Sequence, residues 1–240
     1  WQTMADMQIG SKIIGSNGFA CSVVAINDAG VHPVYRVSFS DGTSTECSPN
    51  HLWTVDRVWG KRQRLTVRTS EIAERFAYRS PAGNVQYLYR LPVTQPIFFE
   101  TVGPLPLHPY IVGALLGDGS IKTGRPKMTS ADPELIETMR ERLPATCIIT
   151  KSVRYQYNVG DVTGRRGQGK VSRAVLAIQA AGIWGHGAEN KFIPDRYKFA
   201  NITDRLELLR GLMDTDGSGS GGVASFHTCS ERLAHDVRFI

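Results

Sequence analysis

Two short segments of the chain share a pattern that constrains its fold more than any other feature of the sequence. Residues 113–120 have the sequence GALLGDGS and residues 211–218 have the sequence GLMDTDGS, so an apolar helix leads into an Asp-Gly pair in both. The two aspartates, Asp118 and Asp216, are 98 residues apart. A repeat at this spacing predicts two half-domains related by pseudo-symmetry.

Both segments also place small residues four positions apart, which puts them on one face of a helix. These residues are Gly113 and Gly117 in the first segment, and Gly211 and Thr215 in the second. Small residues at this spacing let two helix backbones approach closely, a rule best known from membrane helices. If the two helices cross there, their C-terminal ends meet and the two aspartates lie side by side.

Two carboxylates at adjacent helix C-termini are unfavourable without a cation. Each opposes the helix dipole, at a cost of about 0.3–1 kcal/mol, and the two charges repel one another. Mg²⁺ binds one or two carboxylates together with waters and phosphate oxygens, and metal ions held in this way promote phosphodiester hydrolysis. The pattern therefore predicts a Mg²⁺ or Mn²⁺ site at Asp118 and Asp216. For one isolated Asp-Gly pair, a simple helix end would be the better interpretation.

A calcium loop does not explain the segment DTDGSGSGG at 214–222. An EF-hand that began at Asp214 would need Glu at position 225, which is Ser225. One that began at Asp216 would need Glu at position 227, which is His227. Both alternatives lack the bidentate carboxylate that closes such a loop.

The two segments resemble a known family. IVGALLGDG and LRGLMDTDG are similar to the paired dodecapeptide motifs of the LAGLIDADG (DOD-type) homing endonucleases, although Leu116-Gly117 stands where Asp-Ala is common. The resemblance implies that Asp118 and Asp216 are the catalytic, metal-binding acids. It also implies a catalytic lysine in a Lys-x-x-Pro segment between the motifs, where this chain has Lys191. A lysine beside the scissile phosphate would stabilise developing charge or tune the attacking water.

The region between the motifs is strongly basic. Residues 122–173 contain 11 Lys and Arg against 5 Asp and Glu, which equals the whole net charge of +6. Alternation along a single strand over 152–158 would place Arg154, Gln156 and Asn158 on one face, and such side chains read base edges in the major groove. The family resemblance implies a curved sheet that straddles the duplex. An ordinary solvated strand face remains almost as good an interpretation of the sequence alone. The residues expected to contact DNA are Lys122, Arg125, Lys127, Lys151, Arg154, Gln156, Asn158, Arg165, Arg166 and Lys170.

The first part of the chain indicates a small all-β module with hairpin turns at Asn17-Gly18 and Asp41-Gly42. Residues 34–55, VYRVSFSDGTSTECSPNHLWTV, resemble the second conserved block of intein (Hint) splicing domains. The resemblance implies that His51 polarises the scissile peptide bond at the upstream splice junction and that the Ser48 hydroxyl assists, with Ser in place of the usual Thr. A structural histidine at a strand start is the alternative.

We therefore expect a β-rich, Hint-type module at residues 1–107 and a mixed α/β (α+β) LAGLIDADG domain with a pseudo-two-fold repeat at residues 108–240. Trp1 is not a Cys or Ser nucleophile and no His-Asn pair stands at the end, so we expect this arrangement to be truncated at both ends. The implied function is site-specific cleavage of double-stranded DNA by a monomeric, Mg²⁺-dependent enzyme embedded in a host protein (its extein) in cis. The alternatives are a non-catalytic DNA-binding module and a splicing element with an inactive nuclease.

Cysteine usage and hydropathy set the expected compartment. The 4 cysteines include no Cys-x-x-Cys pair, so a zinc site lacks support, and their low density indicates a reducing cytoplasm. No apolar run approaches the roughly 18 residues of a membrane span.

Overall fold

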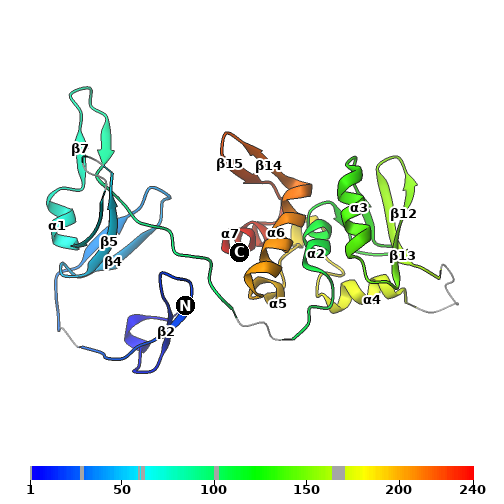
Figure 1. Ribbon diagram of the computed structural model, residues 1–240, viewed down its shortest axis with the longest axis horizontal. Coiled ribbons are helices and arrows are strands. Elements are labelled where there is room, and N and C mark those ends of the chain that lie inside the picture. The colour runs from blue at the N-terminus through cyan, green and yellow to red at the C-terminus, as the bar shows by residue number, and fades with distance from the viewer. Residues whose placement is uncertain (1, 28–29, 59, 61–62, 100–102, 164–170) are drawn as a thin grey trace. The chain divides into compact units, whose positions relative to one another are not determined.

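The structure is a computed structural model that describes residues 2–27, 30–58, 60, 63–99, 103–163 and 171–240. The chain divides into two compact units, Trp1–Ile97 and Phe98–Ile240 (Figure 1). The second unit begins before the boundary expected at residue 108, because Phe99 packs edge-on against Phe199 at 5.3 Å and stacks on Phe239 at 6.5 Å.

The first unit consists of short antiparallel sheets. Hairpins pair β1 (Lys12–Ile14) with β2 (Ala20–Ser22), β3 (Tyr35–Ser38) with β4 (Ser44–Cys47), and β7 (Ala77–Arg79) with β8 (Val85–Tyr87). A further sheet has the order β6-β5-β9, with bounds Gln63–Arg68, Leu52–Arg57 and Tyr89–Arg90. The unit also contains the 3-10 turn η1 (Met4–Asp6) and the helix α1 (Thr69–Glu74).

The two hairpin turns predicted in this unit are confirmed. Gly18 and Gly42 have φ values of 81° and 84°, a conformation in which glycine has no steric penalty. Asp41 closes its turn by accepting hydrogen bonds from the backbone N–H and the hydroxyl of Thr43.

The second unit alternates helices and strands. In chain order these are α2 (Pro109–Leu116), β10 (Gly119–Ser120), β11 (Lys127–Thr129), α3 (Pro133–Arg142), β12 (Cys147–Val153), β13 (Gln156–Asp161), α4 (Arg173–Ala180), η2 (Ala188–Asn190), α5 (Asp195–Lys198), α6 (Ile202–Asp216), β14 (Gly217–Ser220), β15 (Val223–Phe226) and α7 (Glu231–Phe239). One antiparallel sheet has the order β10-β11-β13-β12, and β14 pairs with β15.

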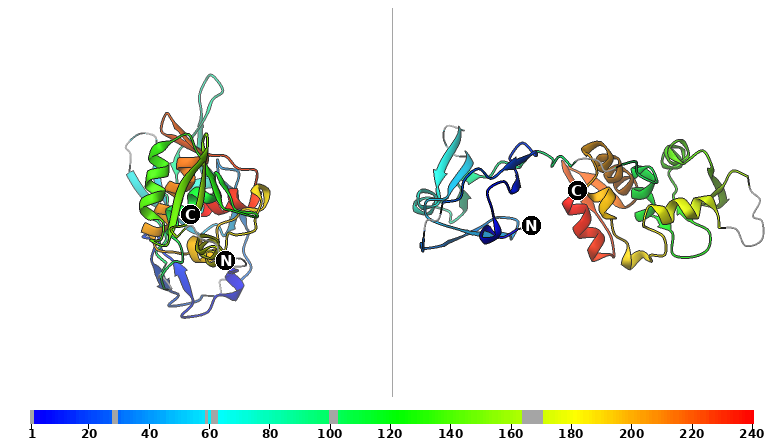
Figure 2. Two further views of the ribbon diagram at one scale, coloured as in Figure 1. Left: turned by 90° about the vertical axis from the view of Figure 1, so that its right-hand side faces the viewer. Right: turned by 90° about the horizontal axis from the view of Figure 1, so that it is seen from below.

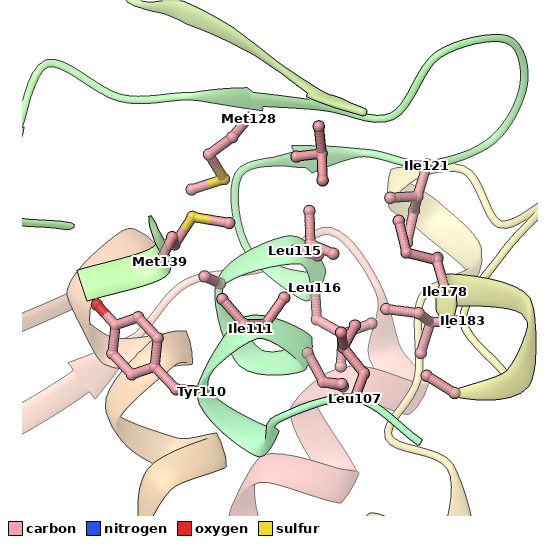
Figure 3. Packing of buried hydrophobic residues seen from close by; sticks show 14 of the residues in the cluster. Leu107, Tyr110, Ile111, Leu115, Leu116, Ile121, Met128, Met139, Ile178 and Ile183 are labelled. Carbon is pink, nitrogen blue, oxygen red and sulfur yellow. The ribbon is translucent and has the colours of Figure 1, made fainter. Parts of the chain in front are cut away.

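One face of the four-stranded sheet forms the core with the helices. Met128, Ile149 and Val159 lie on this face and are at most 2% exposed. They join one hydrophobic cluster with residues of α2, α3 and α4, and Figure 2 shows α3 beside the strands of this sheet. Figure 3 shows Met128 and Met139 together on one side of α2, with Ile121, Ile178 and Ile183 on the other. The opposite face of the sheet is left to solvent.

The order of elements repeats at the offset that the sequence indicates. A helix, two paired strands and a second helix occur as α2-β10-β11-α3 and again as α6-β14-β15-α7. Gly119 and Gly217, which begin β10 and β14, are 98 residues apart, and so are Pro133 and Glu231, which begin α3 and α7. Among the described residues, no helix has the length and apolar character required to cross a bilayer.

Candidate functional site

The site is built on the crossing of α2 and α6, which lie side by side in the second unit (Figure 1). A Cβ atom at Gly113 would lie 2.2 Å from the carbonyl oxygen of Leu208, and one at Gly211 would lie 2.2 Å from that of Tyr110. Tyr110 and Leu208 are themselves 98 residues apart. The contact is therefore reciprocal, as in an interface between two-fold related copies. The small-residue crossing predicted from the sequence is present.

The same crossing continues to the ends of the two helices. A Cβ at Gly117 would lie 1.9 Å from the hydroxyl oxygen of Thr215 and 3.4 Å from Oδ2 of Asp216. The backbone carbonyl of Asp118 accepts a hydrogen bond from Thr129 at 3.4 Å, and that of Asp216 accepts one from His227 at 3.1 Å. Each aspartate is thus fixed between the end of a central helix and a neighbouring strand, with the Asp216 carboxylate directed at the end of α2.

The electrostatics of the two aspartates show that they belong to one site. Burial among neighbouring groups raises the pKa of the Asp118 carboxyl, the negative charge of Asp216 raises it further, and Lys191 acts in the opposite direction. Burial also raises the pKa of Asp216, against the lowering effects of Lys191 and His227. Both carboxylates are therefore harder to ionise than free aspartate and would be stabilised by additional positive charge.

Lys191 reaches this centre from a separate segment. Its side chain is only 5% exposed, and Nζ donates to the carbonyl oxygens of Gly117 at 2.5 Å and Gly119 at 3.0 Å, the two neighbours of Asp118. Burial lowers the pKa of the ammonium group, while the charges of Asp216 and Asp118 raise it. The structure therefore brings together all three residues that the sequence assigned to catalysis.

Helix α7 positions the segment that contains Lys191. The Ser230 hydroxyl donates to the carbonyl oxygen of Lys191 at 2.6 Å and also caps α7 by accepting from the N–H of Leu233. The carboxylate of Asp236 accepts from the N–H of Ile193 at 2.9 Å and pairs with the Lys198 ammonium group at 2.5 Å. These contacts hold the backbone on both sides of the lysine.

The two carboxylates fit a hard divalent cation such as Mg²⁺ or Mn²⁺ better than zinc. Within the described part of the chain, no group of three or more His, Cys, Asp or Glu side chains is placed to hold a metal ion. A four-ligand zinc site would need such a group. Mg²⁺ or Mn²⁺ needs only one or two carboxylates when water and phosphate oxygens complete its shell, and a bound cation would offset the burial and the mutual repulsion of these two carboxylates.

The predicted DNA-contacting residues divide between different surfaces. Lys127 is directly opposite Asn158 in the sheet, and Gln156 lies on the same face, which is turned to solvent. Lys122 and Arg125 lie in the loop between β10 and β11. Arg165, Arg166 and Lys170 lie outside the described residues.

The prediction of a single strand over 152–158 is wrong. Two of the residues predicted to contact DNA, Arg154 and Lys151, therefore do not share the face of Gln156 and Asn158. The chain turns at Arg154 and Tyr155, between β12 and β13, and Tyr155 has a φ of 64°. The Arg154 guanidinium lies over the Tyr155 ring at 4.7 Å and donates to its hydroxyl, so it is part of the turn. Lys151 pairs with Tyr157, which places it on the face of β12 opposite to that of Asn158.

In the first unit, Ser48 and His51 lie in one tight turn before β5. The N–H of His51 donates to the carbonyl oxygen of Ser48 at 3.1 Å, and the His51 ring packs edge-on against Trp53 at 4.9 Å. The carbonyl of His51 accepts from both the N–H and the hydroxyl of Thr69, which also binds the Trp53 indole N–H. The turn is therefore anchored through its backbone, and the exposed His51 imidazole takes part in none of these hydrogen bonds.

The sequence interpretation missed His227 as a member of the site. It follows β15 and its charge lowers the pKa of Asp216. A signal was present, since position 227 is 98 residues after Thr129, which occupies the same place in the first repeat. The two halves therefore share a backbone arrangement but differ in the side chain next to the aspartate.

The chain is similar in sequence to a protein described as a helicase. No family model matches the chain. In an alignment of 256 residues, it is 29% identical to a protein from Mycobacterium intracellulare described as replicative DNA helicase DnaB. The alignment covers 99% of this chain but only 39% of that protein.

Proposed function

We propose that the second unit is a metal-dependent endonuclease of the LAGLIDADG type that cuts double-stranded DNA, and that the chain belongs to a protein-splicing element within a host protein. One observation supports the nuclease above all others. The reciprocal crossing of α2 and α6 gathers two acidic residues at the helix ends, with a buried lysine hydrogen-bonded beside them.

Each residue would have a definite task in hydrolysis. Mg²⁺ or Mn²⁺ held by Asp118 and Asp216 would supply Lewis-acid chemistry at a phosphodiester bond. The two aspartates bind and orient the cation, since their own repulsion favours its uptake. Lys191 places a fixed positive charge at the same point, where negative charge develops on the phosphate. Lys127, Gln156 and Asn158 on the open face of the sheet would position the duplex.

The similarity to a helicase supports an inserted element better than a helicase motor. A motor driven by ATP hydrolysis would need a phosphate-binding loop of the form G-x-x-x-x-G-K-[S/T]. The nearest approach in this chain, GRRGQGKV at 164–171, has Val171 at the position of the required hydroxyl. An alignment that covers nearly all of this chain and 39% of the helicase is expected if both proteins share an intervening segment. The turn at Ser48 and His51 favours a splicing role for the first unit, and a host of this kind would place the chain in the cytoplasm.

Cleavage of the uninterrupted host gene tests the nuclease. The chain would be incubated with Mg²⁺ and a plasmid that contains the helicase coding sequence without the aligned segment. We expect a double-strand cut by the parent chain. Asp118→Asn and Asp216→Asn should each remove cutting but retain duplex binding, because they remove charge from the metal site and not from the sheet.

The control is Glu141→Gln, which removes one negative charge from an exposed position on α3. It should cut like the parent. If the parent cuts neither this plasmid nor a library of random duplexes, or if the two aspartate variants cut normally, the nuclease proposal is wrong. Duplex binding without cutting by the parent would instead support the non-catalytic DNA-binding module.

A further inference from the structure

A pocket next to Lys191 contains a second group of basic side chains. It has a volume of ≈ 370 Å³ and is formed by the loop after β10, the segment around η2 and the first turn of α7. The residues that matter for its chemistry are Lys122, His186, Glu189, Asn190, Phe192 and Arg232. Asn190 and Phe192 are the chain neighbours of Lys191. The pocket is therefore adjacent to the candidate catalytic centre.

The Phe192 ring organises two of the basic groups. The Arg232 guanidinium lies over the ring with Cζ 3.8 Å from its centroid, and the His186 ring meets it edge-on at 4.9 Å and 82°. A guanidinium stacked on an aromatic ring keeps its N–H donors free at its edges and loses less conformational freedom when it binds an anion. The loop of Lys122 is fixed as well, because the N–H of Gly185 donates to the carbonyl of Ile121 at 2.9 Å.

The positive charges of this pocket are not neutralised. Neither Lys122 nor Arg232 forms an ion pair with any carboxylate that the structure describes, whereas Arg142, Arg210 and Lys198 all do. Glu189 also lines the pocket, and its carboxylate accepts a hydrogen bond from Asn190 at 3.2 Å. Two unpaired cations against one carboxylate leave the pocket positively charged, which suits an anionic ligand.

The internal repeat does not reproduce the basic residues of this pocket. The position 98 residues before Arg232 is Glu134, and the position 98 residues after Lys122 is Ser220. The pocket therefore combines Lys122 of the first repeat with Arg232 of the second, and the equivalent positions on the other side of the two-fold arrangement, Ser220 and Glu134, do not form a basic pair. A ligand bound there would lie on one side of the catalytic centre.

We infer that Lys122 and Arg232 bind backbone phosphates of duplex DNA next to the phosphate that faces Asp118, Asp216 and Lys191. Arginine offers paired donors that match phosphate oxygens, and lysine adds a point charge. The inference rests on the proposed function, since it treats the substrate as DNA. It makes Lys122 and Arg232 positioning residues that fix the duplex over the scissile bond.

The salt dependence of duplex binding tests this inference. Association constants of the full chain for a fluorescent random-sequence duplex would be measured by anisotropy over a range of NaCl concentrations. Lys122→Gln and Arg232→Gln should each reduce the slope of log K against log [salt] by about 0.9, as expected for one lost phosphate contact. Binding should weaken equally for all duplex sequences.

A matched control is the double variant Arg140→Gln/Arg210→Gln, which removes two positive charges that are already paired with Glu137 and Glu207. Its slope should equal that of the parent. If the two pocket variants also match a parent that binds duplex DNA, the pocket inference fails while the nuclease proposal stands. If the parent binds but never cuts DNA, and the two pocket variants still show the reduced slope, the pocket inference stands and the nuclease proposal is rejected. A parent that does not bind duplex DNA at all rejects both.

Inorganic phosphate distinguishes DNA from a small anion. At constant ionic strength, phosphate should compete only weakly with the duplex, because a single anion makes few of the contacts that a DNA backbone makes. Tight, saturable phosphate binding that is lost in Arg232→Gln while the salt slope for DNA is unchanged would overturn the assignment to DNA.

Discussion

Asp118 illustrates at the level of one residue how the proposed metal site opposes stability. Its folded-state pKa is raised, so folding favours the protonated form and disfavours the carboxylate. The ionised group therefore destabilises the fold at pH values above its folded pKa, and this effect disappears as the pH falls through that pKa. The same holds for Asp216, whose pKa is also raised.

Asp118→Asn should therefore stabilise the second unit at neutral pH while it abolishes cleavage. Removal of a carboxylate that opposes a helix C-terminus corresponds to about 0.3–1 kcal/mol. Urea unfolding of both proteins at several pH values would measure the difference. The advantage of the variant should shrink as the pH is lowered toward the pKa of Asp118. A variant less stable than the parent at pH 7 would contradict the prediction.

Lys191 should control the ionisation of both aspartates. Its charge lowers the pKa of Asp118 and of Asp216, so Lys191→Met should raise both values further and remove cleavage. Titration of the carboxyl groups by ¹³C NMR would measure the shift. Lys151→Met, at an exposed position on β12, is the control and should leave both pKa values unchanged. Unaltered carboxyl titrations in Lys191→Met would show that the lysine does not act on the site.

At the scale of elements, the crossing of α2 and α6 depends on glycine at two reciprocal positions. Alanine is more favourable than glycine inside a helix by about 1 kcal/mol. Gly211→Ala should nevertheless destabilise the unit, because the new Cβ would lie 2.2 Å from the Tyr110 carbonyl oxygen and 2.8 Å from the Ala114 nitrogen. Overpacking of this kind typically costs about 1–3 kcal/mol.

Thermal or urea unfolding would check the sign of this effect. Gly160→Ala in β13 is the matched control, since a Cβ there would have no neighbour within 4 Å, and its effect should stay within about 0.5 kcal/mol. Stabilisation by Gly211→Ala would show that the helices are not in contact.

Elements with local signals were predictable from the sequence. An Asp-Pro pair is a typical helix-start signal, and at the start of α3 the Asp132 carboxylate accepts from the N–H of Glu134 at 2.8 Å as an N-cap does. The turn between β12 and β13 had no such signal. Tight hairpin turns usually contain Gly or Asn where φ is positive, whereas here Tyr155 adopts a φ of 64° beneath the Arg154 guanidinium. The prediction that Arg154 shares a strand face with Gln156 and Asn158 was wrong for this reason.

Contacts between distant segments were predictable only where the repeat or the family motif indicated them. Asp118 and Asp216 could be placed together because their helices share a small-residue pattern. The stacking of Arg232 and His186 on Phe192 joins positions with no shared pattern in the sequence, so neither residue was singled out. The Pro-rich segment before α2 likewise has no pattern that indicates its contacts, although Leu107 is buried and its N–H and carbonyl both bind the Tyr197 hydroxyl.

At the scale of the whole molecule, the hydrophobic core is distributed very unevenly. Every member of the main buried cluster belongs to the second unit. In the described part of the first unit, the buried apolar side chains are Val55 and Leu88. Because buried apolar area is the main favourable term in folding, the two units should differ widely in stability.

We therefore expect the first unit to unfold and to be digested before the second. Limited trypsin digestion should first cut within residues 1–97 and leave a resistant fragment that retains α2 to α7, as mass spectrometry would show. Calorimetry should record two transitions. Leu208 is fully buried in the cluster, so Leu208→Ala should reduce the free energy of unfolding of the second unit by about 2–5 kcal/mol and shift only the transition at higher temperature. Val55→Ala should shift only the transition at lower temperature. A single transition shifted by both substitutions would mean that the two units unfold together, and the proposed nuclease site would then depend on the first unit as well as the second.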